Sequence, residues 1–153
     1  MSRSIYRTLS VCALVIAGLV ATATSAADKR NALIIDGQNN HGAWPKTTFM
    51  MKRYLEDTGL FTVDIARTAF TWQGKDLLEK YPLAGVTTTA TDKPQPDPDF
   101  KPAFAKYDVV ISNFGFGAAP WPAETQASFE EYVRGGGGLV IVHASRWSRN
   151  TGE

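Results

Sequence analysis

The two histidines of the chain, His41 and His143, each follow an apolar run that predicts a buried strand. Ligands of an open parallel sheet bind beyond the carboxyl ends of its strands. Both imidazoles are therefore candidate catalytic residues of one crevice, as an acid and a base or as metal ligands with Asp36. The alternative places His41 in an exposed loop and His143 at a hydrogen-bonded strand end. Because no short-range spacing of metal ligands occurs, we predict no metal and no cofactor.

Polar side chains suited to sugar hydroxyls also stand at the ends of the predicted strands. Asp36 ends the first strand and precedes Asn39 and Asn40, Arg67 ends the second, and Asn113 follows the third. A carboxylate can orient a ligand hydroxyl or cap the next loop, and asparagine is also an ordinary turn former. We predict Asp36, Asn40 and Asn113 as ligand-binding residues, with a small-molecule sugar or glycoside as the partner.

Three tryptophans could stack on a sugar ring, although packing is the more frequent role of this residue. They are Trp44, Trp72 and Trp121. Trp72 falls within residues 68–101, whose composition predicts a long irregular insertion on the surface. We therefore expect Trp72 to matter little for binding, and we place the site where the loops after Asp36, Ser112 and Val142 converge.

The strands and helices that position these residues alternate along the chain, which predicts an α/β fold with a parallel sheet. Continuous apolar runs at 31–36, 107–112 and 138–143 are typical of buried parallel strands. The alternation in 61–67 suits a strand near a sheet edge. Between residues 76 and 80 the sequence predicts a single helical turn.

Two longer helices are expected. The first begins at Pro45 and ends at Gly59, where glycine can adopt a left-handed conformation. The second begins at Pro122, carries an apolar stripe of Phe129, Tyr132 and Val133, and stops at the four glycines 135–138. These glycines precede a strand, so they form a turn into the sheet rather than a phosphate-binding loop.

The N-terminal residues 1–26 have the order of a secretory signal peptide. Arg3 and Arg7 precede an apolar run at 11–20, and small residues follow at 21–27. The run is short for a membrane span, which takes about 20 residues, although an N-terminal anchor is the alternative. Cleavage near Ala26 predicts a periplasmic or secreted protein with no stable membrane association.

The remainder after cleavage is close to neutral and has no cysteine. The whole chain has 16 Lys and Arg against 15 Asp and Glu, and cleavage would remove two of the arginines. No block of like charge is present, so we expect no nucleic-acid partner. The single cysteine is Cys12, inside the apolar run, which excludes disulfides and a cysteine nucleophile from the rest of the chain.

Residues 27–145 form the expected domain, and residues 146–153 an irregular tail. The last predicted strand is apolar on both faces and would normally be followed by a covering helix. We expect a gene product that is truncated or frame-shifted after residue 145. The alternative is a small complete domain with a frayed tail.

Three segments together resemble the ThuA-like (trehalose-utilisation) family. They are Asp-Gly-x-Asn-x-His at residues 36–41, Tyr-Asp-Val-Val-Ile at 107–111, and the helix end, glycines and strand at 132–144. The resemblance covers about residues 30–145. It implies a flavodoxin-like three-layer sandwich related to class I glutamine amidotransferases, of which this chain would hold the N-terminal part.

The resemblance implies carbohydrate use better than it implies a reaction. Glutaminase chemistry needs a cysteine nucleophile, which this part of the chain lacks. We expect a secreted domain linked to the utilisation of trehalose or another glycoside, with His41 and His143 at the crevice. A noncatalytic carbohydrate-binding module and a gene fragment without a stable fold are the alternatives.

Overall fold

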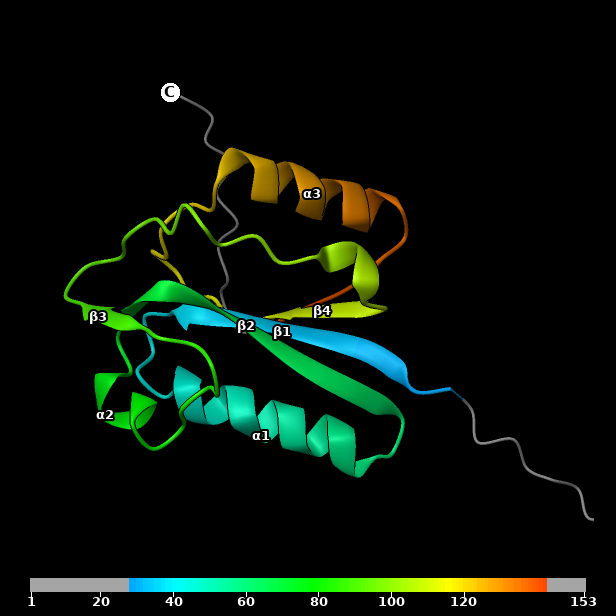
Figure 1. Ribbon diagram of the computed structural model, residues 1–153, viewed down its shortest axis with the longest axis horizontal. Helices are drawn as coiled ribbons and strands as arrows, with labels where there is room; N and C mark the ends of the chain where they lie inside the picture. Colours follow the sequence, from blue (N-terminus) through cyan, green and yellow to red (C-terminus); the bar gives the residue numbers. More distant parts are fainter. Residues whose placement is uncertain (1–27, 143–153) are drawn as a thin grey trace, which may run out of the picture.

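The computed structural model describes residues 28–142, which build helices on both faces of one sheet (Figure 1). The expected signal peptide, His143 and the tail lie outside the described residues. In chain order the elements are β1 (Arg30–Gln38), α1 (Trp44–Asp57), β2 (Phe61–Trp72), α2 (Lys75–Leu78), β3 (Thr89–Thr91), the 3₁₀ helix η1 (Phe104–Lys106), β4 (Val109–Ser112), α3 (Ala123–Arg134) and β5 (Gly138–Ile141).

All strand pairs in the described sheet are parallel, and the strand order is β3-β2-β1-β4-β5. From β1 the chain passes through α1 to β2 on one side, and later returns to pair β4 with the other side of β1. In Figure 1, α1 and α2 lie below the sheet, whereas η1 and α3 lie above it. The arrangement confirms the predicted α/β fold and is consistent with a flavodoxin-like sandwich, with the change of direction between β1 and β4.

The core has two parts because successive side chains of a strand point to opposite faces. Leu33 and Ile35 of β1 pack on the α3 side, and Ala32 and Ile34 pack on the α1 side. The cluster on the α3 side is completed by Phe100, Phe104, Val110, Phe114 and Phe129. The cluster on the α1 side is completed by Val63 and Ile111, with Met51 and Leu55 of α1 against it.

The helix boundaries largely follow the sequence signals. Pro45 lies in the first turn of α1, and Gly59 has a φ of 73° just after its end. The α3 helix begins after Pro122, and Phe129 is buried. The prediction for Val133 was wrong, because this side chain is 39% exposed. The buried face of α3 runs through Thr125 and Phe129 towards Tyr132, and Val133 lies at its margin.

The β2 strand is longer than predicted and irregular. Asp36 pairs with Arg67, but Gln38 pairs with Trp72, so residues 68–71 of β2 stand opposite Gly37 alone. The expected surface insertion at 68–101 was therefore partly wrong. Its first residues continue β2, residues 89–91 form β3, and Phe100 is buried in the core. As predicted, the first part of β2 lies at a sheet edge, because β3 pairs only with residues 70–72.

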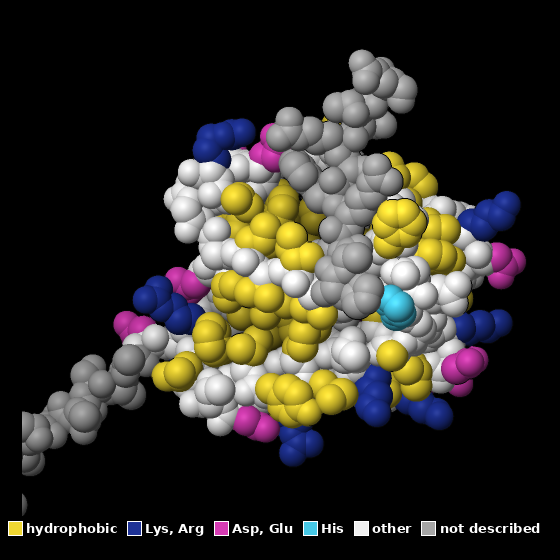
Figure 2. Space-filling view, turned by 180° about the vertical axis from the view of Figure 1, so that it is seen from behind, with side chains coloured by type: hydrophobic (Ala, Val, Ile, Leu, Met, Phe, Trp, Pro, Cys, Tyr) yellow, Lys and Arg dark blue, Asp and Glu magenta, His cyan; other side chains and the backbone are white. Residues whose placement is uncertain are grey.

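The β5 strand leaves apolar side chains uncovered within the described part of the chain. Leu139, Val140 and Ile141 are between 38% and 53% exposed. Figure 2 shows hydrophobic side chains gathered in broad patches on the side opposite to that of Figure 1. In residues 28–142 no helix is both long enough and apolar enough to cross a bilayer.

Candidate functional site

The loops after β1 and β4 meet at the carboxyl edge of the sheet, as the topology predicts. The Gly115 amide donates to the Gln38 carbonyl at 3.0 Å, and the Asn39 Nδ2 donates to the Asn113 carbonyl at 2.9 Å. A Cβ on Gly115 would lie 2.5 Å from Oδ1 of both Asn39 and Asn40. A side chain there would separate the two loops, so Gly115 permits their contact.

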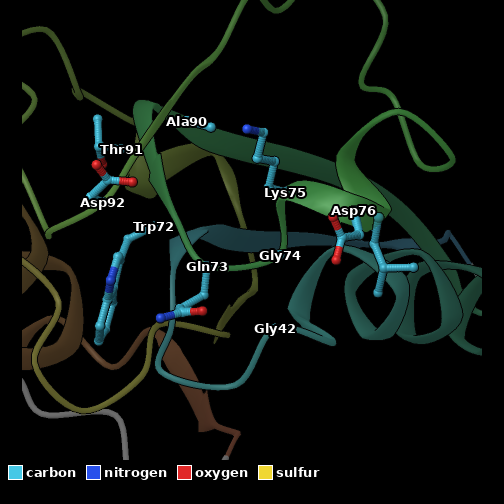
Figure 3. Close-up of a pocket in the computed structure, with 10 residues that line it drawn as sticks. Gly42, Trp72, Gln73, Gly74, Lys75, Asp76, Ala90, Thr91 and Asp92 are labelled. Carbon is cyan, nitrogen blue, oxygen red and sulfur yellow. The ribbon is translucent and has the colours of Figure 1, made fainter.

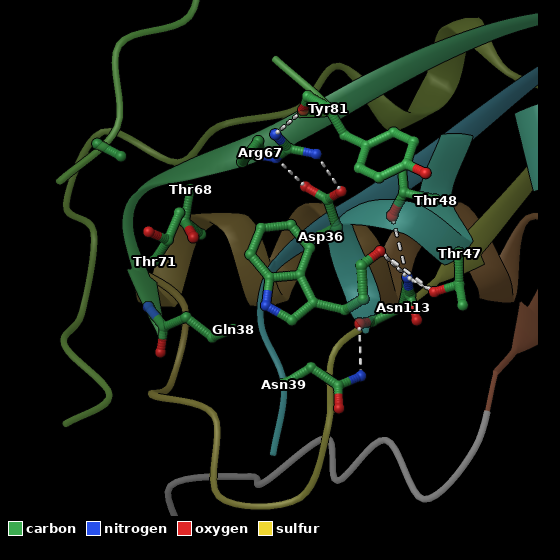
Figure 4. A network of polar contacts seen from close by, with 12 residues as sticks. Asp36, Gln38, Asn39, Thr47, Thr48, Arg67, Thr68, Thr71, Tyr81 and Asn113 are labelled. Atoms are coloured by element: carbon green, nitrogen blue, oxygen red, sulfur yellow. Dashed lines mark hydrogen bonds and ion pairs between the residues drawn. The ribbon is translucent and has the colours of Figure 1, made fainter. Parts of the chain in front are cut away.

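Asn113 was predicted as a ligand-binding residue, but the structure binds its amide within the protein (Figure 4). The side chain is 2% exposed, and Nδ2 donates to Thr48 Oγ1 at 2.9 Å and to the Trp44 carbonyl at 3.3 Å. Both acceptors lie in the first turns of α1. Asn113 therefore ties the loop after β4 to the start of this helix, rather than facing a ligand.

Asn40 and His41 are exposed at the same edge. Their predicted roles in ligand binding and catalysis stay predictions, and exposure of His41 was the alternative considered. Asn40 Nδ2 lies 3.4 Å from His41 Nε2, and the His41 backbone amide donates to Asn39 Oδ1 at 2.8 Å. The loop is thus held by Asn39 while its next two side chains reach solvent. Val142, the last described residue, donates its amide to the Ser112 carbonyl at this edge.

Asp36 was also predicted to bind a ligand, and the structure instead buries it in an ion pair with Arg67 (Figure 4). Arg67 Nε and Nη2 donate to the two carboxylate oxygens, each at 2.8 Å, and the two side chains are 0% and 1% exposed. The pKa of the Asp36 carboxyl is raised above its ordinary value, because the effect of burial exceeds the lowering by the charge and hydrogen bonds of Arg67 and by the hydrogen bond of Thr48. Arg67 was expected at the end of its strand, but β2 continues five residues beyond it.

A cavity of about 570 Å³ opens beside the loops that follow β1 and β4, at the carboxyl ends of β2 and β3 (Figure 3). Its volume lies within the range typical of small-molecule sites. Figure 3 shows Trp72 along one wall and the carboxyl groups of Asp76 and Asp92 on opposite sides. The lining residues are Gly42, Trp72, Gln73, Gly74, Lys75, Asp76, Leu77, Ala90, Thr91 and Asp92.

Trp72 is half-buried and also approaches the loop after β4, since a Cβ on Gly117 would lie 3.6 Å from its ring. Trp72 thus lies between the cavity and the convergent loops. The prediction that Trp72 belongs to an irregular surface insertion was wrong, because it is the last residue of β2. Of the other two predicted stacking residues, Trp44 is 1% exposed and Trp121 packs among the aromatic rings of the α3-side core.

The sequence reasoning named none of the residues that line this cavity as binding residues, and it expected Trp72 to matter little for binding. A signal was present for the strand extension, because threonine and aromatic residues continue from Thr68 to Trp72. Threonines at 87–89 and 91 give a similar signal for β3, but this strand has only three residues and borders a proline-rich loop. Within residues 28–142, no three His, Cys, Asp or Glu side chains come together as a possible metal site.

No family model matches the chain, and no curated protein matches it. Among solved structures, a ThuA-like protein from Parabacteroides merdae is similar in fold, with a TM-score of 0.55 and 28% sequence identity. The match covers 74% of this chain and 32% of that protein, so the chain spans about a third of its length. The similarity in fold and sequence agrees with the resemblance to the ThuA-like family that the motif from Asp36 to His41 indicates.

Proposed function

We propose that the chain binds a sugar or glycoside, such as trehalose, in the cavity beside Trp72 and serves carbohydrate utilisation. The observation that carries the proposal is the combination of one aromatic wall with polar side chains around a cavity of suitable size. Trp72 offers an apolar face for a sugar ring. The carboxylates of Asp76 and Asp92 accept hydrogen bonds from hydroxyl groups, and the Lys75 ammonium donates them.

The charges around the cavity favour a neutral sugar over an acidic one. Asp76 and Asp92 contribute two negative charges against the single positive charge of Lys75. An anionic sugar would therefore meet net repulsion, although exposure of these side chains to water weakens the effect. Trehalose and simple glucosides are neutral and offer many hydroxyl groups, which fits this surface.

Replacing Trp72 with alanine should weaken the binding of trehalose or a simple glucoside by about tenfold. An aromatic contact contributes about 0.5 to 1.5 kcal/mol beyond the apolar area it buries, and about 1.4 kcal/mol corresponds to a factor of ten in Kd. Calorimetric titration of the domain measures this change, and glucuronate should bind more weakly than glucose.

The matched control is Tyr54→Ala, which removes an aromatic ring that is 61% exposed near the far end of α1. Its affinity should equal that of the unaltered domain. Circular dichroism should show that both variants are folded. If the Trp72 and Tyr54 variants then bind the sugar with equal affinity, the sugar does not bind in this cavity.

Turnover of the bound sugar is a second candidate function, and one observation favours it. Gly42 lines the cavity and directly follows His41, so an exposed imidazole stands one residue from the proposed ligand. His41 could act there as a general acid or base, with His143 as its proposed partner. If His41→Ala loses glycoside turnover while its Kd is unchanged, His41 acts in catalysis. If the unaltered protein binds the sugar without turning it over, the domain is a binding module.

We expect export of the protein with cleavage near Ala26. The order of arginines, an apolar run and small residues in 1–26 is what signal peptidase substrates share. N-terminal sequencing of the periplasmic or secreted product checks the cleavage position. A cytoplasmic product that retains Met1 would contradict the proposal.

A further inference from the structure

The turn between β2 and α2 forms part of the cavity lining and has an unusual backbone. Gln73 has a φ of 58° and Gly74 a φ of 72°, so two consecutive residues are left-handed. Gln73 is the non-glycine residue with positive φ in the described chain. Left-handed backbone is unfavourable for a residue with a Cβ by about 1 kcal/mol or more, so its surroundings must hold this turn.

The buried indole of Trp44 makes the contacts that can hold it. Its Nε1 lies 3.1 Å from the Trp72 carbonyl and 3.3 Å from the Gln73 carbonyl, so one donor serves both peptide groups of the turn. A Cβ on Gly74 would lie 2.8 Å from the same Nε1. Trp44 therefore contacts each of the three residues from Trp72 to Gly74, all of which line the cavity.

Trp44 is itself held by a contact with a buried cation. The Arg67 guanidinium carbon lies 4.8 Å from the centre of the indole ring, in a cation–π geometry. Arg67 is held in turn by its two hydrogen bonds to Asp36. The chain of contacts runs from a buried ion pair through Trp44 to the backbone that carries Trp72.

From these contacts we infer that Trp44 is a positioning residue of the sugar site: its indole N–H holds Gln73 left-handed and so sets the place of Trp72 and Gly74 in the cavity wall. The expected effect of Trp44 on sugar affinity rests on the proposed function. Its effect on the backbone conformation of Gln73 does not, because that conformation can be measured without any ligand.

The test compares Trp44→Phe with Trp121→Phe. Both replace a tryptophan by a smaller ring, but Trp121 is partly buried and packs on the α3 side with Phe104 and Phe129. In Trp44→Phe, the Cα and Cβ chemical shifts of Gln73 should lose their left-handed signature, and trehalose affinity should fall about fivefold, as expected for one lost hydrogen bond. In Trp121→Phe both quantities should stay unchanged.

A second variant tests the cause. Glycine adopts positive φ without penalty, so in a Gln73→Gly background the substitution Trp44→Phe should lower affinity about twofold or less. Left-handed shifts retained at Gln73 in a folded Trp44→Phe variant would overturn the inference, as would an equal affinity loss in both backgrounds. If Trp44→Phe loses the left-handed chemical shifts of Gln73 but the unaltered protein binds no sugar, then Trp44 does hold the turn and only the proposed function is rejected.

Discussion

Replacing Arg67 with methionine should lower the free energy of unfolding by about 3 to 5 kcal/mol, the cost of leaving a buried charge without its partner. Asp36 would remain fully buried with both carboxylate oxygens deprived of Arg67. The guanidinium also lies against Trp44 and donates to the Tyr81 carbonyl at 3.4 Å, and both contacts would be lost. Urea unfolding followed by circular dichroism measures the effect.

The control for this prediction is Arg53→Met. Arg53 pairs with Asp57 on the surface of α1, with side chains 80% and 66% exposed, so its loss should cost no more than about 0.5 kcal/mol. The double variant Asp36→Leu with Arg67→Met should recover much of the lost stability, because burial of the pair is itself costly. A single Arg67 variant as stable as the Arg53 variant would show that the ion pair is not structurally important.

Replacing Gly37 with alanine should destabilise the domain by at least about 2 kcal/mol, because backbone strain and overpacking each cost about 1 to 3 kcal/mol. Gly37 has a φ of 129°, and a Cβ there would lie 2.0 Å from Thr68 Oγ1 and 3.0 Å from the Thr68 amide nitrogen. The backbone cannot move away easily, because Asp36 and Gln38 on either side are paired with β2. Thermal or urea unfolding checks the value.

Gly59→Ala separates the two causes. Gly59 also has a positive φ, of 73°, but nothing lies within 4 Å of its Cβ position. It should therefore show the backbone cost alone, about 1 to 2 kcal/mol. If Gly37→Ala cost no more than Gly59→Ala, the close approach of β1 to the irregular part of β2 would have no energetic importance.

The strands and helices of the fold could be predicted where one local signal decided them. The apolar runs of β1 and β4 fill both faces of a central strand, so their burial follows from composition. Pro45 and Gly59 marked the limits of α1 through their own backbone preferences. These signals act within a few residues, and the structure agrees with them.

The parts that escaped prediction depend on contacts distant in sequence. Asp36 has the sequence context of a loop cap, and nothing near it reveals that Arg67, 31 residues later, takes both carboxylate oxygens. Asn113 has the context of a loop ligand, yet its amide is bound by α1. Topology predicted a site at the carboxyl edge of the sheet, and this location stays a prediction. The cavity proposed here lies to one side of that location, because β2 extends past its expected end.

The cavity is built largely outside the hydrophobic core. None of the residues 75–92 belongs to either core cluster, although Lys75, Asp76, Thr91 and Asp92 of this segment line the cavity. Substitutions there remove no buried apolar contacts from the central strands, so they should cost little folding free energy. For the proposed site, substitutions at Lys75, Asp76 and Asp92 should therefore change the ligand preference at little cost in stability, and libraries that randomise these three positions should consist mainly of folded proteins.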